Sequence, residues 1–454
     1  MFRMLYNKKS IRHKMGIKGE RDMPSSKELF KALDGGRFDA LFTRLYGSAN
    51  IAYQRKRYSS AVKSFVDRFG DRNNLYLFSA PGRTEIGGNH TDHNHGRVLA
   101  ASVNLDVIAV AAPCSEARIR VKSAGYPMDT VELKDLAVRK EEKNRSSSLV
   151  RGMAARFVQR NVAVGGFDAY TTSDVLKGSG LSSSAAFEIL LGTIFSHLFN
   201  QGALSPIELA KAAQYAENVY FGKPSGLMDQ VASSVGGIMA IDFADPEQPE
   251  VKRIHFPFSD CGYHLCIVDT GGNHAALTHE YAAVPAEMRA VAHSLGVEYL
   301  RDASLSLLIP QIPALRRLHG DRAVLRAMHF LEENSRVVRQ VEALESGNFE
   351  EFKRLVIESG HSSFEYLQNV YAPGDPANQG LSLALCLAQL HLNGRGAWRV
   401  HGGGFGGTTQ NFVPDDRLAS FRDTMETVFG KGSCHSLTIR PCGGIRVEAD
   451  VLPD

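Results

Sequence analysis

The 454-residue sequence has no long hydrophobic segment and few cysteines. No apolar run approaches the roughly 20 residues that a membrane-spanning helix needs, which argues against an α-helical membrane protein. The six cysteines are scattered without any Cys-x-x-Cys pair, and no signal peptide is recognisable. This pattern predicts free thiols in a reducing compartment, and therefore a cytoplasmic protein with no membrane partner.

Two common nucleotide-binding motifs are missing from the stretch richest in glycine and serine, residues 177–186. No Gly-Lys-Ser/Thr follows its glycines as in a Walker A loop, and Ser183 stands where a dinucleotide fingerprint has its third glycine. The glycines nevertheless allow backbone N–H groups to converge on an anion, and the apolar segment from Phe187 predicts a helix whose positive end adds to this. A phosphate-binding loop is indicated. The alternative is a flexible loop that caps an ordinary helix.

The composition is that of a globular protein, with 43% hydrophobic and 22% charged residues, and the length allows two or three domains. The net charge of +3 is unevenly placed, because residues 1–22 carry +5 and the remainder −2. This basic tail lacks the interleaved aromatic residues of a nucleic-acid-binding segment. We expect a disordered tail, or sequence upstream of a true start at Met23, and no nucleic-acid partner.

Residues 23–72 have the pattern of a helical extension, with a capping box at Ser25–Glu28 and a break at Gly35-Gly36. A first lobe is expected over 73–258 and a second over 259–454, divided after an acidic, proline-rich turn at 245–249. Strands are predicted at 75–80, 98–103, 107–111, 119–121, 238–243, 263–269, 398–401 and 410–413. Helices are predicted at 149–157, 187–199, 206–219, 315–367 and 384–392.

The segment 81–96 is expected to form a polar, glycine-punctuated loop between two strands. Many hydrogen-bonding side chains in one turn suit recognition of a polyhydroxylated ligand, which needs donors and acceptors at fixed angles. A metal site built from His90, His93 and His95 is one alternative, although neither helical spacing nor nearby cysteines support it. A purely structural turn is the other.

Four stretches stand in order along the chain: Ala80-Pro81-Gly82-Arg83…His90-Thr91-Asp92…Asn94…Gly96; Gly178-Ser179-Gly180-Leu181-Ser182-Ser183-Ser184-Ala185-Ala186; Ala216-Glu217-Asn218…Gly226-Leu227-Met228-Asp229-Gln230; and His401-Gly402-Gly403-Gly404-Phe405-Gly406-Gly407. Together they resemble the motifs of galactokinases in the GHMP kinase superfamily, over residues 75–413. The resemblance implies an α+β fold with two lobes, a ribosomal S5 domain 2-like N-terminal lobe and a ferredoxin-like C-terminal lobe. ATP and sugar would meet between them.

The implied activity is transfer of the ATP γ-phosphoryl group to the anomeric hydroxyl of galactose, with ATP and Mg²⁺ as cofactors. By resemblance the phosphates are cradled by Gly178, Ser179, Gly180, Leu181, Ser182, Ser183 and Ser184. Mg²⁺, which prefers few hard oxygen ligands from protein, is assigned to Ser184 and Glu217. Asp229 is the catalytic carboxylate, as a base or as a group that orients the sugar hydroxyl. Arg83 is its partner.

The residues implied for sugar binding are Arg83, Asn89, His90, Asp92, Gly226, Asp229 and Tyr281. Asn89 departs from the family, which usually has a glutamate contacting the 6-hydroxyl of galactose; Thr84 and Glu85 also replace the usual valine and asparagine. An amide can donate as well as accept, so we expect weaker galactose binding and less discrimination against galacturonate.

Two other functions stay open at this point. One is a sugar 1-kinase for another galacto-configured sugar, such as galacturonate, N-acetylgalactosamine or arabinose. The other is a non-catalytic sugar sensor, which the serine run and Asp229 disfavour because a pure binder needs neither. The oligomeric state is open between a monomer and larger assemblies.

Overall fold

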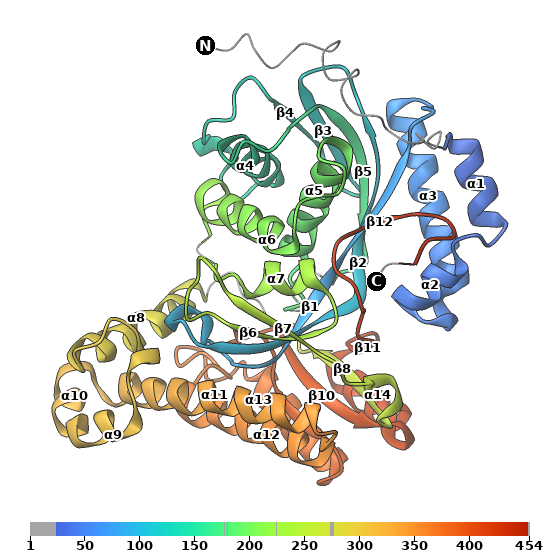
Figure 1. The fold of residues 1–454 in the computed structure, drawn as a ribbon. Helices are drawn as coiled ribbons and strands as arrows, with labels where there is room; N and C mark the ends of the chain where they lie inside the picture. The colour runs from blue at the N-terminus through green and yellow to red at the C-terminus, as the bar shows by residue number, and fades with distance from the viewer. Residues whose placement is uncertain (1–23, 177, 179, 224, 273–276, 453–454) are drawn as a thin grey trace.

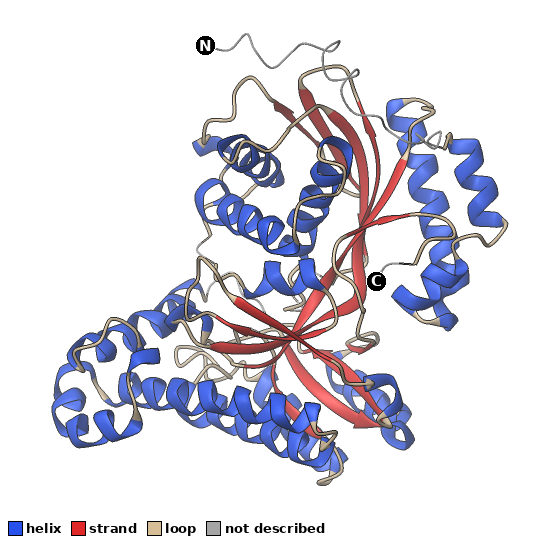
Figure 2. Cartoon of the chain, viewed as in Figure 1, coloured by secondary structure: helices blue, strands red, loops and turns tan. Residues whose placement is uncertain are grey.

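The computed structural model describes residues 24–176, 178, 180–223, 225–272 and 277–452 (Figure 1). The predicted basic tail and Ser179 lie outside the described residues. The fold is α+β, with an eight-stranded and a four-stranded sheet and helices packed on both (Figure 2). Among the described residues, no helix is long and apolar enough to cross a membrane.

The larger sheet has the order β12-β1-β2-β5-β3-β4, and β6 and β7 extend it from β2. Its pairs are antiparallel except for β3 with β5. The strands are β1 (Tyr76–Gly87), β2 (Arg97–Pro113), β3 (Arg118–Ser123), β4 (Met128–Glu132), β5 (Phe167–Ser173), β6 (Ile238–Asp242), β7 (Glu250–Ile254) and β12 (Ile445–Val447).

Helices cover both faces of this sheet, because alternate strand residues point to opposite sides. Phe78 and Ala109 belong to the core shared with the helices that follow β3 and β4, whereas Leu77 and Ile108 belong to the core of the N-terminal extension. The first set comprises α4 (Ser146–Gln159), α5 (Ser183–Phe199), α6 (Pro206–Tyr215) and the π-helical turn η4 (Ala216–Phe221). The helix α7 (Met228–Val235) packs in a separate core with Val98 and Ala100 of β2. The extension comprises α1 (Ser26–Asp34), α2 (Asp39–Tyr46) and α3 (Ile51–Phe69), on the right in Figure 1.

A buried ionic network joins the extension to the sheet. Arg57 on α3 and Arg440, just before β12, both bond to Asp106 on β2, at 2.6 and 3.0 Å. Burial alone would raise the pKa of the Asp106 carboxyl, but the two guanidinium groups outweigh it and hold this pKa below its usual value. The extension is therefore an integral layer of the fold.

The smaller sheet has the order β11-β8-β10-β9 and lies in the second lobe. Its strands are β8 (Tyr263–Asp269), β9 (Ala397–Val400), β10 (Thr408–Pro414) and β11 (Cys434–Leu437). The helices of this lobe are α8 (Thr278–Ser294), α9 (Leu305–Leu308), α10 (Ile312–His319), α11 (Asp321–Glu345), α12 (Phe349–Ser362), the π-helical turn η8 (Ser363–Leu367), α13 (Gly380–Leu392) and α14 (Leu418–Phe429).

Two expectations need correction. The loop expected at 81–96 is shorter, because β1 continues to Gly87, with register shifts against β2 between Pro81 and Arg83 and between Glu85 and Gly87. Proline and glycine indicated a loop, but bulges let a strand contain both. The expected strands 98–103 and 107–111 are one continuous strand, β2.

The last strand, β12, does not join the second lobe that was expected over residues 259–454. β12 pairs with β1, in the sheet of the first lobe. The first and the last described strands thus lie side by side in the same sheet, and the segment before and within β12 contributes to the core of the N-terminal extension through Cys442 and Val447.

Candidate active site

The predicted phosphate loop contains three residues with left-handed backbone conformation. Gly178, Gly180 and Ser182 have φ angles of 72°, 68° and 56°. Glycine adopts this conformation freely, whereas a serine in it is uncommon and typical of functional sites. Ser183 begins α5, and no side chain caps this helix. A 17-residue helix thus presents its N-terminus beside the loop, an arrangement suited to binding an anion.

Ser182 does not cap α5 because its hydroxyl is turned to another partner. Its Oγ donates to Oδ2 of Asp229 at 2.7 Å, and Nε of Arg83 donates to Oδ1 of the same carboxylate at 2.7 Å. Arg83 also bonds to the phosphate loop, through its guanidinium to the carbonyl of Gly180 and through its backbone N–H to Leu181. The carboxylate of Asp229, in the first turn of α7, is therefore fixed between the first motif and the phosphate loop.

The protonation state of Asp229 follows from these contacts. Burial by itself would raise the pKa of this carboxyl, but the charge of Arg83 and the hydrogen bonds from Arg83 and Ser182 outweigh burial and hold the pKa below its usual value. Asp229 is thus an ionised acceptor at neutral pH.

Glu217, in the turn η4, is the second carboxylate of the site and is only 2% exposed. Its Oε1 accepts from Ser184 Oγ at 3.1 Å and from Lys223 Nζ at 3.0 Å. Its Oε2 accepts from Ser225 Oγ and from Gln230 Nε2, at 2.7 and 2.8 Å. Four groups thus converge on one carboxylate.

The oxygens of Ser184 and Glu217 fit a magnesium ion that takes few ligands from protein. Neighbouring ligands in an octahedron at about 2.1 Å from Mg²⁺ lie about 3.0 Å apart, close to the 3.1 Å between Ser184 Oγ and Glu217 Oε1. Among the described residues, no group of three or more His, Cys, Asp or Glu side chains could hold a metal ion. The alternative of a site made by His90, His93 and His95 thus has no support in the described part of the chain.

His90 and Asp92 follow the end of β1, and Asp92 lies against Gly226, three residues before Asp229. The backbone N–H of His93 donates to Asp92 Oδ1 at 3.0 Å, and a Cβ at Gly226 would collide with Oδ2. Glycine at 226 is therefore required for the close approach of Asp92. His90 Nε2 lies 2.9 Å from the carbonyl of Gly403, and burial lowers the pKa of this histidine to about 4, so its ring is neutral at pH 7.

Tyr281, in the first turn of α8, reaches the same region from the second lobe. Its hydroxyl donates to the carbonyl of Gly404 at 2.7 Å, and burial raises its pKa to about 12. A side chain at Gly403 would collide with the tyrosine ring. The glycine-rich stretch 401–407 is thus packed between Tyr281 and His90.

Asn89 has no exposed surface, and its amide is fully engaged by protein groups. Nδ2 donates to Glu85 Oε1 at 2.9 Å and to the carbonyl of Gly402 at 2.6 Å. Oδ1 accepts from Ser363 Oγ at 3.2 Å and from Asn369 Nδ2 at 2.8 Å. The sequence predicted a contact with the sugar. The geometry favours a structural role instead, because all four hydrogen-bonding positions of an amide are used.

Several residues that hold this loop were missed by the sequence analysis. Glu333 Oε1 accepts from the backbone N–H of Gly88 at 2.9 Å, and His329 Nε2 lies 2.9 Å from the carbonyl of Asn89. Both side chains are buried on α11. Their spacing with buried Arg326 places ionisable residues at i, i+3 and i+7 on one helix face. A polar stripe on an otherwise amphipathic helix was the signal that could have indicated them.

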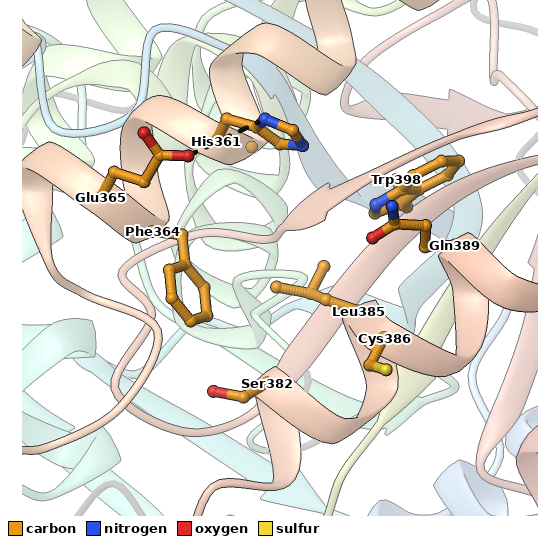
Figure 3. Close-up of a pocket in the computed structure, with 9 residues that line it drawn as sticks. His361, Phe364, Glu365, Ser382, Leu385, Cys386, Gln389 and Trp398 are labelled. Atoms are coloured by element: carbon orange, nitrogen blue, oxygen red, sulfur yellow. Dashed lines mark ion pairs between the residues drawn. The ribbon is translucent and has the colours of Figure 1, made fainter. Parts of the chain in front are cut away.

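One cavity, of about 270 Å³, lies in the second lobe (Figure 3). It is lined by α12, η8, α13 and β9, through Gly360, His361, Phe364, Glu365, Ser382, Leu385, Cys386, Gln389 and Trp398. None of the site residues predicted from the sequence lines it.

The chain matches two family models. Residues 63–113 match the galactokinase galactose-binding signature, and residues 148–237 match the GHMP kinases N terminal domain. A galactokinase of Glaesserella parasuis serovar 5 (strain SH0165) is 31% identical over 391 residues, which are 84% of this chain and 97% of the relative.

Solved structures of the same fold include a Lactococcus lactis galactokinase complexed with galactose. Its TM-score is 0.75 at 24% identity, over 86% of this chain and 100% of the other. The Methanococcus jannaschii mevalonate kinase follows with a TM-score of 0.59 at 15% identity, over 81% of this chain and 99% of the other. Both likenesses show the GHMP kinase fold, with the two lobes expected from the motifs.

Proposed function

The chain belongs to the galactokinase family, and on this premise we propose that it transfers the γ-phosphoryl group of ATP to the anomeric hydroxyl of galactose, giving galactose 1-phosphate. The observation that carries the proposal is the carboxylate of Asp229, held between Arg83 and Ser182. A sugar hydroxyl that approaches this carboxylate also approaches the phosphate loop, so donor and acceptor meet at one point.

Asp229 receives the sugar hydroxyl. Its ionised carboxylate accepts the hydrogen bond of the hydroxyl that attacks, which orients the oxygen lone pair towards the phosphorus. Because Arg83 lowers the basicity of Asp229, this orienting role is favoured over early removal of the proton. Arg83 contributes positive charge on the same side, where charge builds up on the transferred group.

The loop 178–184 and the N-terminus of α5 hold the phosphates of ATP. Backbone N–H groups at a helix N-terminus favour anions because they have no partner within the helix. Ser184 and Glu217 are the residues that would hold Mg²⁺. When bound, this ion neutralises charge on the phosphate oxygens.

His90, Asp92, Gly226 and Tyr281 shape the sugar site in this proposal. Asp92 can accept hydrogen bonds from two sugar hydroxyls, and neutral His90 is held in place by Gly403. In this proposal Asn89 does not contact the sugar but fixes the loop that carries His90. The departure at residue 89 is thus accommodated by protein contacts.

The experiment is a turnover assay with MgATP and a panel of free sugars: galactose, galacturonate, N-acetylgalactosamine, arabinose and glucose. We expect galactose to give the highest kcat/KM. A non-catalytic sensor would bind a sugar without consuming ATP. A kinase for another sugar would have a higher kcat/KM with that sugar than with galactose.

A further inference from the structure

The charged ammonium group of Lys223 lies beside Glu217, the carboxylate expected to bind the metal ion. The ammonium Nζ lies 3.0 Å from Glu217 Oε1, the same oxygen that accepts from Ser184. Glu217 is nearly fully buried, whereas the side chain of Lys223 is 56% exposed. The lysine therefore reaches the carboxylate from the open side of the site.

The backbone around Lys223 fixes its starting point. The turn η4 ends at Phe221 and is followed by Gly222, whose φ is 85°. The N–H groups of Gly222 and Lys223 both donate to the carbonyl of Glu217, at 2.9 and 3.2 Å. A π-helical turn is often a feature of functional sites. Since the backbone is fixed while the four-carbon side chain is not, only the ammonium group is free to change partners.

The surroundings of Lys223 carry negative charge that belongs to the proposed reaction centre. Its ammonium interacts electrostatically with the carboxylates of Glu217 and Asp229, whereas burial raises the pKa of nearby Glu188 well above its usual value. Arg83 approaches Asp229 at Oδ1, and Lys223 adds a second positive charge to the surroundings of that carboxylate. Two cations next to the nucleophile's acceptor suit a transferring phosphoryl group, whose charge is spread over three oxygens.

We propose that Lys223 is a phosphate-binding catalytic residue of this site, which contacts the γ-phosphoryl group of ATP and competes with the divalent cation for Glu217. The proposal rests on the kinase function proposed above. The competition follows from geometry, since Lys223 Nζ and Ser184 Oγ already use both acceptor positions of Glu217 Oε1. A divalent ion that joins Ser184 to Oε1 must share that oxygen with the ammonium group or displace it.

The first test measures nucleotide binding without turnover. In the presence of saturating Mn²⁺, Lys223→Met should bind the β,γ-imido analogue of ATP roughly tenfold more weakly than the unaltered protein, because one charge-assisted contact is lost. ADP should bind equally well to both, since it lacks the γ-phosphoryl group. Lys223→Arg should retain most of the affinity. Equal weakening for both nucleotides, or none, would overturn the phosphate-binding role.

The second test follows Mn²⁺ itself by electron paramagnetic resonance without nucleotide. Lys223→Met should bind Mn²⁺ about tenfold more tightly, because a competing positive charge is removed. Unchanged Mn²⁺ affinity would overturn the competition. The control is Lys143→Met, an exposed lysine whose side chain lies against Gly222. The same shifts in this variant would show a general charge effect and overturn the specific role.

Turnover then links the residue to the reaction. With galactose, kcat of Lys223→Met should fall roughly tenfold to hundredfold while KM for galactose stays the same. If the unaltered protein did not phosphorylate galactose, the proposed function would fail, but both binding tests would still decide the role of Lys223.

Discussion

Arg83 and Asp229, 146 residues apart in the sequence, meet through a hydrogen bond of 2.7 Å. Asp229→Asn keeps the size of the side chain but removes the charge that accepts the sugar hydroxyl. We expect kcat to fall on the order of 100-fold or more, with little change in nucleotide affinity. Steady-state kinetics and nucleotide titration measure the two. Turnover close to that of the unaltered protein would contradict the assignment.

The same contact predicts a pH dependence. The pKa of Asp229 lies below its ordinary value, so kcat/KM should fall on the acid side only as the pH drops through this lowered pKa, below 3.8. In Arg83→Met, the Asp229 carboxyl loses the charge and the hydrogen bond of Arg83, which oppose the effect of burial on its pKa. The pKa of Asp229 should therefore rise, and the acid limb of the kcat/KM profile should move to higher pH. Arg83→Lys keeps a charge and should move it less. Circular dichroism restricts the comparison to the pH range in which all variants are folded. An acid limb that stays in place would mean that another group controls it.

Removal of either proposed metal ligand should change the response to magnesium. Ser184→Ala and Glu217→Gln each remove one of few protein oxygens, so each should raise the Mg²⁺ concentration for half-maximal rate. Ser225→Ala, which removes a hydroxyl that bonds to the other oxygen of Glu217, is the matched control and should have a smaller effect. If neither ligand variant shifts the Mg²⁺ dependence, the ion is held by nucleotide and water alone.

The ionic network of Asp106 predicts a cost in stability. Asp106→Asn leaves Arg440 buried without its carboxylate and Arg57 with only Asp174 as an acidic partner, and the free energy of unfolding should fall by about 3 kcal/mol or more. Because the pKa of Asp106 is lowered, the network's contribution is present above the unfolded pKa and is lost as the pH falls through the folded pKa. Urea unfolding measures it. Asp450→Asn, in an exposed pair with Arg37, should leave the midpoint unchanged.

Substitutions at Asn89 test whether this residue has a structural role or determines the sugar specificity. Asn89→Asp places a second buried carboxylate beside Glu85. It also replaces the amide that donates to the carbonyl of Gly402 with a carboxylate oxygen, which cannot donate, so the melting temperature should fall. Adding Glu85→Gln removes the like charge and should recover part of the loss, with a coupling of about 1–3 kcal/mol. A changed preference between galactose and galacturonate at unaltered stability would instead restore the direct sugar contact expected from the sequence.

The motifs could indicate candidate site residues because each motif is local in sequence, and the roles of these residues stay predictions. The capping box at Ser25 and the strand Tyr263–Asp269 were predicted correctly for the same reason, since spacing and flanking residues decide them. Expectations failed where distant segments decide the environment. Residues 81–87 form a strand because the second lobe covers their polar side chains, as Arg399 does for Glu85. No periodicity within the segment could show this.

The partners of Asn89 in the second lobe were beyond sequence reasoning for the same reason. Ser363 and Asn369, for example, come from positions 274 and 280 residues further along the chain. The contact of Ser182 with Asp229 was also hidden, because a serine before a helix usually caps it. Here the left-handed conformation of Ser182 turns its hydroxyl to the carboxylate.

The measurement that tests the central claim most directly is the position of the phosphate in the product. The protein is incubated with MgATP and galactose, and the product is examined by ³¹P NMR, with Asp229→Asn as the inactive control. We predict a single sugar phosphate whose phosphorus couples to the anomeric proton, formed by the unaltered protein and greatly reduced in the variant. Phosphate on another carbon, or ATP consumption that needs no galactose, would contradict the account.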